Sequence, residues 1–203
     1  MTEKLNLPAA FAGIKTFIRL PGAESTQTAA RAVIEAGSAW PALVIADEQT
    51  AGRGRHGDAW FSGPGGLYLT LGLKTNVPSK ELPVLSVRMA GAVSSALAGV
   101  YGIKTRIKEP NDVLAYNPAR DEYLKICGII AESAALRRHP EWLLIGIGVN
   151  INNALPKTLP AATTVAEIKG AKQDAREFAA VLLENFQKEY SEWESGAICR
   201  NGY

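Results

Sequence analysis

Short apolar runs of strand length recur along this chain and restrict its fold more than any other feature. They occupy residues 42–46, 66–74, 105–108, 124–132 and 142–150, and their leucine-rich and β-branched composition is typical of strands. Few helical segments separate them, so the chain lacks the strand–helix–strand alternation of a parallel sheet. The pattern predicts an α+β, loosely α/β, fold in which a mixed and mostly antiparallel sheet carries helices packed on one side. The last two runs are expected to pair as antiparallel neighbours.

Three segments have the signals of helices. Ser25 or Thr26 can begin a helix that ends at Gly37, because a hydroxyl at that position accepts a free amide hydrogen of the first turn. Residues 82–100 and 174–193 repeat apolar side chains every three or four positions, which is the spacing of one helix face. We expect both of these apolar faces to cover the sheet.

Composition narrows the class of protein. The chain has 203 residues, of which 47% are hydrophobic and 21% charged, with a net charge of +2. These values fit one folded domain over residues 1–203 and give no broad basic surface for nucleic acid. There is no basic and apolar leader and no run of the ~20 apolar residues that a membrane span requires, so a cytoplasmic protein is expected. Cys127 and Cys199 lack partners at metal-ligand spacing, which predicts neither a zinc site nor a disulfide framework.

The loop at residues 51–57 is the most unusual segment of the chain. Three glycines alternate there with Arg53, Arg55 and His56. Glycine lets the backbone approach a phosphate closely, and arginine donates paired hydrogen bonds to phosphate or carboxylate oxygens. The loop is therefore a candidate anion site, with a flexible loop of solvated arginines as the alternative.

A second polar segment surrounds a proline. Lys108, Asn111 and Asp112 lie next to Pro110, which cannot continue a central strand ladder. The amide and the carboxylate suit a ribose, a phosphate or a magnesium ion. The alternative is that they only cap a turn.

A lysine and several glycines mark two of the expected strands. Lys125 stands at the start of one strand, and Gly128, Gly146 and Gly148 leave one strand face without side chains. A bare face of this kind admits either a ligand or a closely packed neighbour. The residues alone do not decide between the two.

Taken in order, these motifs resemble the signatures of the biotin protein ligase catalytic domain. The matching segments are residues 24–26, 49–57 with Trp60, 108–112, 125–129 and 146–150. The resemblance implies the biotin/lipoate protein ligase fold, which is similar to that of class II aminoacyl-tRNA synthetases. It also implies an enzyme that uses ATP to convert biotin to biotinyl-5'-AMP and transfers biotin to a lysine of a biotin carboxyl carrier protein.

The same resemblance implies roles for particular residues. Ser25, Thr26 and Gln27 would meet the ureido ring of biotin, with Gln49 helping to define the pocket. Lys125 would meet the carboxylate. The residues implied for the rest of the adenylate are Arg53, Gly54 and Arg55 in a closing loop, with Trp60, Lys108, Asn111, Gly128 and Asn150 around the ATP portion.

The chemistry that the resemblance implies also needs catalytic groups. A carboxylate and a phosphate repel each other, so Arg55 and Lys125 would stabilise the charge that develops as they react. Asp112 would act near magnesium or the incoming lysine. Magnesium would arrive with ATP, and no separate metal site in the protein is expected.

The chain departs from the family pattern in places. Glu109 stands where the family usually has tryptophan, and Asp58 where a basic residue is frequent. The sequence ends soon after the last helical segment, so the small β-barrel domain that commonly follows is expected to be absent. No helix-turn-helix domain precedes the match, and no repressor activity is expected.

Two other functions stay open on the sequence. One is a lipoate- or octanoate-type acyl ligase or transferase of the same superfamily, which would want a longer apolar tunnel and a different arginine motif. The other is a catalytically weak ligand-binding homologue, suggested by Glu109 and the missing domain. The acceptor protein and the oligomeric state, with a homodimer among the alternatives, are not determined by the residues.

Overall fold

The structure is a computed structural model that describes residues 13–75, 77–133 and 142–201. The side chain of Cys199 lies outside the described part of the chain. The elements in chain order are β1 (Thr16–Leu20), α1 (Thr26–Glu35), β2 (Ala42–Ala46), η1 (Arg55–Gly57), β3 (Leu67–Lys74), η2 (Ser79–Glu81), α2 (Leu82–Tyr101), β4 (Thr105–Lys108), β5 (Asp112–Asn117), β6 (Glu122–Ser133), β7 (Trp142–Val149), α3 (Val165–Lys169) and α4 (Ala175–Asn201).

One seven-stranded sheet organises the molecule, with the strand order β1-β2-β3-β7-β6-β5-β4. β1 pairs with β2 in parallel, and all other neighbours are antiparallel. The predicted mixed, mostly antiparallel sheet is therefore confirmed. The expected pairing of β6 with β7 is confirmed as well, with Gly128 opposite Gly148.

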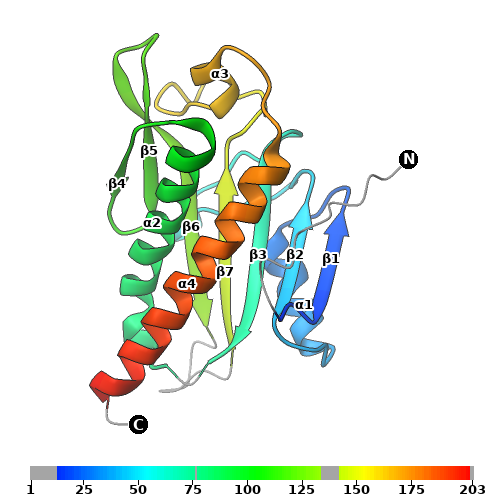
Figure 1. Cartoon of the computed structure of the whole chain (residues 1–203). Coiled ribbons are helices and arrows are strands. Elements are labelled where there is room, and N and C mark those ends of the chain that lie inside the picture. The colour runs from blue at the N-terminus through cyan, green and yellow to red at the C-terminus, as the bar shows by residue number, and fades with distance from the viewer. Residues whose placement is uncertain (1–12, 76, 134–141, 202–203) are drawn as a thin grey trace.

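Helices cover both faces of this sheet. α2 and α4 lie side by side on the face nearest the viewer in Figure 1, where they bury the main core with strand residues such as Leu43 and Ile45. On the opposite face, Ala30 and Ile34 of α1 pack against Val44. The expected side is thus correct for the two long helices. α1 lies on the other side because β2 is apolar on both faces, and Val44 points away from the main core that Leu43 and Ile45 enter.

The helix signals in the sequence correspond to real caps. The Ser25 hydroxyl accepts a hydrogen bond from the Gln27 amide at the start of α1. α2 ends at Gly102, whose φ of 66° is the left-handed conformation that glycine adopts without strain. By length and composition, residues 79–101 are apolar enough to cross a membrane, yet Leu85, Met89 and their neighbours are buried against the sheet, as in a core helix.

Two strands and one α-helix were not predicted from the sequence. β1 is a half-buried edge strand, β5 begins directly after the polar turn at Asn111, and α3 has only five residues. β5 matters for function because it joins that turn to the sheet. Its alternation of buried and partly exposed residues leaves one face of the strand toward the side of the sheet that carries α1.

Candidate active site

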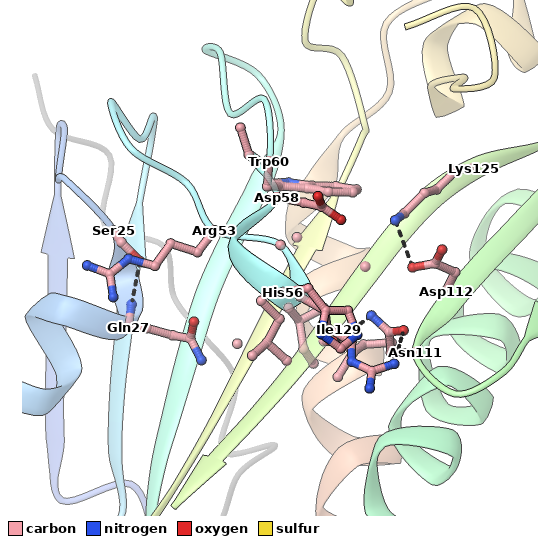
Figure 2. Close-up of a pocket in the computed structure, with 18 of the residues that line it drawn as sticks. Ser25, Gln27, Arg53, His56, Asp58, Trp60, Asn111, Asp112, Lys125 and Ile129 are labelled. Carbon is pink, nitrogen blue, oxygen red and sulfur yellow. Dashed lines mark hydrogen bonds and ion pairs between the residues drawn. The ribbon is translucent and has the colours of Figure 1, made fainter. Parts of the chain in front are cut away.

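A cavity of about 300 Å³ opens on the sheet face that carries α1. All of the site residues predicted from the sequence line it except Asn150. They come from the start of α1, the loop after β2, the turn between β4 and β5, and β6. Figure 2 shows their side chains converging on one space. Segments from distant parts of the sequence thus form a single site.

The floor of the cavity is backbone, because glycines of β6 and β7 face it. Gly128 and Gly148 pair across the two strands, and the ring of Trp60 lies over both of them. A Cβ atom on Gly128 would come within 3.2 Å of the Trp60 ring, and one on Gly148 would overlap its Nε1. The bare strand face expected from the sequence therefore admits Trp60 at close range.

Trp60 connects the floor to the charged part of the site. The Lys125 ammonium lies 5.3 Å from the centroid of its ring, a cation–π distance. The Trp60 Nε1 hydrogen is buried and has no hydrogen-bond partner among the described residues. A buried donor without a partner is costly, and this one lies against Gly148 on the cavity floor.

A chain of hydrogen bonds fixes the start of α1. Gln49 Oε1 accepts from the Thr26 amide at 2.8 Å and from its hydroxyl at 3.1 Å. The Thr70 hydroxyl donates to Thr26 Oγ1 at 2.9 Å, and Gln49 Nε2 donates to Ser62 Oγ at 2.8 Å. Thr26 therefore donates to Gln49 and accepts from Thr70, which leaves its oxygen one lone pair for a further donor.

Gln27 supplies a free donor beside this chain. Its side chain is 5% exposed, lies against Gly146 and reaches into the cavity in Figure 2. Its Nε2 atom has no hydrogen-bond partner in the described part of the chain. The end of the cavity at α1 thus offers an unsatisfied N–H group of Gln27 next to an oxygen of Thr26.

The Gly-Arg loop owes its shape to close backbone contacts. A Cβ atom on Gly52 would lie 2.5 Å from the Trp60 carbonyl oxygen, and one on Gly54 would lie 3.0 Å from Asp58 Cβ. His56 has a left-handed φ of 57°, which is uncommon for a residue other than glycine. These contacts hold the arginines at the rim of the cavity.

The two arginines have weak and exposed contacts. Arg53 Nη2 is 3.4 Å from Glu24 Oε1 and 3.2 Å from the Thr28 hydroxyl. Arg55 Nη1 donates to Asn111 Oδ1 at 3.4 Å. Long, solvated contacts of this kind are worth little. Both guanidinium groups can therefore turn to a bound anion at small cost.

The turn between β4 and β5 brings a carboxylate and a cation together. Asn111 Nδ2 donates to the Ile129 carbonyl at 3.1 Å, which orients its amide toward the cavity rim. Asp112 Oδ1 lies 2.8 Å from Lys125 Nζ, with 16% and 36% of the two side chains exposed. This ion pair is drawn in Figure 2 and stands next to the Trp60 ring.

Asn150 is placed differently from the other predicted residues. It follows β7, is 2% exposed, and accepts a hydrogen bond from Asn153 Nδ2 at 3.1 Å. Its backbone bonds to Ile126 and Val165 and so holds the loop that leaves β7. It is not among the residues that line the cavity.

Burial also determines the protonation state of the Cys127 thiol. Cys127 of β6 lies on the sheet face that packs on α2 and α4, opposite to the face of its neighbour Gly128, and it is fully buried. Burial, with a smaller effect from the Asp112 carboxylate, raises the pKa of Cys127 far above its usual range. The thiol stays protonated and does not serve as a nucleophile.

Some residues that line the cavity or support it were given no binding role from the sequence. Asp58, Ile129, Ile130 and Gly146 also line the cavity, and the buried Thr70 lies behind it. The glycine alternation in residues 146–148 was a signal for Gly146. Thr70 gave none, because a single threonine in an apolar strand is ordinary.

Comparisons with known proteins agree with this geometry. A model of the biotin/lipoate A/B protein ligase family matches residues 22–150. The bifunctional ligase/repressor BirA of Bacillus subtilis is 34% identical over 174 residues, which are 83% of this chain and 52% of that protein. A biotin–[acetyl-CoA-carboxylase] ligase of Mycobacterium tuberculosis is 30% identical over 158 residues, 75% of this chain and 55% of that protein. The chain thus spans about half the length of these relatives.

Solved structures match over most of the chain. The biotin protein ligase of Aquifex aeolicus in complex with biotin and ATP superposes with a TM-score of 0.73 and 30% identity, covering 90% of this chain and 73% of that one. The Leishmania major biotin protein ligase in complex with biotinyl-5-AMP gives a TM-score of 0.73 and 26% identity, covering 92% and 79%. On the sequence match and the shared fold together, this chain belongs to the biotin/lipoate A/B protein ligase family.

Proposed function

We propose that this protein activates biotin with ATP to form biotinyl-5'-AMP and transfers the biotin to a lysine of a biotin carboxyl carrier protein. One observation carries the proposal: a buried polar pocket end and a cluster of cations share a single cavity. The relatives that bear ligase names and the structures solved with biotin, ATP or biotinyl-5-AMP support it.

The polar end of the cavity favours biotin over lipoate or octanoate. A cyclic urea presents N–H groups next to a carbonyl oxygen, and the cavity offers the Thr26 oxygen next to the free Gln27 amide. Lipoate and octanoate end in apolar atoms, which would leave the buried Gln27 N–H unsatisfied. A site built for a polar group rejects ligands that lack one, because its own buried groups then stay unpaired.

The charged residues at the opposite end of the cavity suit the first chemical step. A carboxylate oxygen of biotin attacks the α-phosphorus of ATP, a bond forms between them, and the bond to pyrophosphate breaks. Lys125 can turn from Asp112 to the biotin carboxylate, and Arg53 and Arg55 can turn from their weak contacts to the phosphate. Cations aimed at the developing charge lower the barrier, and one such donor is worth on the order of 3 kcal/mol.

The second step needs an amine and a base. The nitrogen of an acceptor lysine attacks the acyl carbon of the adenylate, the bond from that carbon to the phosphate oxygen breaks, and AMP leaves. We assign Asp112 the role of accepting the amine proton, since it is half-buried beside Lys125 at the cavity. Once the biotin carboxylate has become an uncharged acyl group, Lys125 is free to pair with the AMP phosphate.

The donor set at the rim also fits a magnesium ion carried by ATP. Magnesium takes one or two carboxylates and completes its oxygen ligands with phosphates and water. Within the described residues there is no cluster of three His, Cys, Asp or Glu side chains that would form a separate site. Asp112 and Asn111 are the residues that would hold the ion, which would neutralise phosphate charge. The need for ATP supports a cytoplasmic location, which we include in the proposal.

Exchange of labelled pyrophosphate into ATP tests the proposal, with biotin, lipoate and octanoate compared side by side. Biotin should support exchange and the other two acids should not. Gln27→Leu should weaken calorimetric binding of biotin about tenfold, because a hydrogen bond from a buried donor is lost, and should leave ATP binding unchanged. Exchange with none of the acids would contradict the ligase assignment. Exchange with octanoate alone would show that octanoate, and not biotin, is the substrate.

A further inference from the structure

A second surface on the same side of the sheet lies beside the cavity. Val113 and Ala115 of β5 are fully buried in the core, whereas Leu114 and Tyr116, which alternate with them along the strand, stay partly exposed. The strand register places Arg106 of β4 opposite Leu114. Because Asp112 and Lys108 line the cavity, alternate residues of β4 and β5 share its face of the sheet.

Aromatic and basic side chains gather on this surface. The Arg106 guanidinium lies 3.9 Å from the centroid of the Tyr123 ring, and that ring is 5.4 Å from the ring of Tyr116. Lys104, one residue before β4, is exposed and shares the face of Arg106 by alternation. We call these residues the β4–β6 patch: Lys104, Arg106, Leu114, Tyr116 and Tyr123.

The cations of the patch are not neutralised within the described residues. Lys104 and Arg106 form no ion pair there. Glu122 pairs with Arg120, while the Asp121 carboxylate accepts a 2.6 Å hydrogen bond from the Tyr116 hydroxyl and so adds a negative charge at the edge of the patch. The two cations still leave the patch with a net positive charge next to partly exposed aromatic rings, a combination that favours an acidic partner.

The patch borders the reacting end of the cavity. Tyr123 precedes Lys125 by two residues on β6, so their side chains stand on one face about 7 Å apart. A lysine side chain spans a similar length. A protein surface that rested on the patch would thus bring one of its lysines to Lys125 and Asp112, where the proposed transfer takes place.

We propose that the β4–β6 patch is the docking surface for the acceptor protein, and that it recognises acidic groups on that protein beside the target lysine. The inference rests on the proposed function, since it assigns a place to its second substrate. Single-stranded nucleic acid also binds basic and aromatic surfaces. A protein is favoured because the patch adjoins the atoms that react with a protein lysine, and because two cations make a small electrostatic footprint for a phosphate backbone.

Charge reversal tests the docking surface without touching the cavity. Arg106→Glu and Lys104→Glu should each raise the KM for a purified biotin carboxyl carrier domain about tenfold, since like charges then face each other. Pyrophosphate exchange and transfer of biotin to hydroxylamine, which need no docking, should stay at the wild-type level. Arg106→Lys keeps the positive charge, so its KM for the carrier domain should be close to that of the wild type. In the wild type, added salt should raise the KM for the carrier and leave the hydroxylamine rate unchanged.

Lys172→Glu is the matched control, because this lysine is exposed and lies outside the patch and its reversal changes the net charge equally. An unchanged carrier KM in Arg106→Glu, or an equal rise in Lys172→Glu, overturns the docking proposal while normal exchange keeps the ligase function. Absence of exchange in every variant and in the wild type would instead overturn the proposed function. Binding of a single-stranded oligonucleotide that is lost in Arg106→Glu, with carrier transfer unaffected, would reassign the patch to nucleic acid.

Discussion

Gly148 gives the sharpest prediction at the scale of one residue. In Gly148→Ala the new methyl group would overlap Trp60 Nε1, so the ring must leave the cavity floor. Overpacking of this kind costs about 1–3 kcal/mol, and we expect biotin-dependent pyrophosphate exchange to fall at least about tenfold.

Gly91→Ala is the control for that change, since a Cβ atom on Gly91 meets nothing within 4 Å and alanine favours a helix. It should unfold at the same or a higher temperature and keep full exchange. Gly128→Ala, at 3.2 Å from the Trp60 ring, should have an intermediate effect. Full activity in Gly148→Ala would show that Trp60 does not need its place on the floor.

The sequence indicated which residues belong to the site, but not which of them bond to one another. The Gly-Arg loop, the Asn-Asp turn and Lys125 could be chosen from the sequence because their residue types suit anions. The bond from Thr70 to Thr26 joins residues 44 positions apart, and no local pattern contains it. The pairing of Lys125 with Asp112 likewise depends on the register of β5 and β6, which a sequence does not reveal.

At the scale of elements, helices and strands with a clear apolar pattern were predicted correctly, and a strand that begins with polar residues was not. α2 and β2 agree with the residues expected to form them to within a few positions. β5 was missed because the turn residues Asn111 and Asp112 concealed the start of a strand. The position of α1 was missed because its short apolar stripe did not show which face of the sheet it covers.

The loop after β2 is the element with the clearest expected function. In the described part of the chain, the one hydrogen bond from Arg55 to the opposite turn is its 3.4 Å contact with Asn111. If Arg55 closes the loop over the adenylate, Arg55→Gly removes a charge-assisted hydrogen bond worth about 1.5–3 kcal/mol. Biotinyl-AMP should then leave at least about tenfold faster, since about 1.4 kcal/mol corresponds to a factor of ten, and labelling of unrelated lysines should rise.

Stopped-flow measurement of biotinyl-AMP dissociation checks this expectation. Arg55→Lys keeps the charge and loses the paired geometry, so its dissociation rate should lie between those of the wild type and Arg55→Gly. If the dissociation rate of the glycine variant equals that of the wild type, the loop does not act as a gate.

On the scale of the whole molecule, the fold class was accessible from the sequence but the strand order was not. Mostly antiparallel pairing follows from many short apolar runs. Nothing local indicates that β3 pairs with β7 rather than with β4, since these pairings depend on how the complete core is buried. The arrangement of the site could not be predicted for the same reason, because its two sides come together only when the whole sheet has formed.

Buried tyrosines should make the stability of the whole molecule fall at alkaline pH. Burial, helped by Asp174 and Glu177, raises the pKa of Tyr101 to about 12, and burial also raises the pKa of Tyr68 and Tyr190. Unfolded tyrosine titrates near about 10. The folded chain therefore holds protons that the unfolded chain loses, so this stability is complete below about pH 10 and declines as pH rises toward the folded pKa.

Urea unfolding between about pH 8 and 11 measures that decline. Tyr101→Phe should be less stable by about 1 kcal/mol at neutral pH, because its hydroxyl donates to the Asp174 carbonyl at 2.8 Å. Its free energy of unfolding should then fall less steeply with pH than that of the wild type. If the free energy of unfolding fell equally steeply with pH in the two proteins, Tyr101 would not be a source of the alkaline loss of stability.

The strand order has a consequence for how the site comes into being during synthesis. β1, β2 and β3 form one ribbon and β4, β5 and β6 another, and β7 alone joins them at the centre of the sheet. The helix start with Gln27 belongs to the first ribbon, and the turn with Asp112 belongs to the second. A nascent chain that has not yet released residue 149 from the ribosome thus has both walls of the cavity but lacks the strand that pairs with each of them in the sheet.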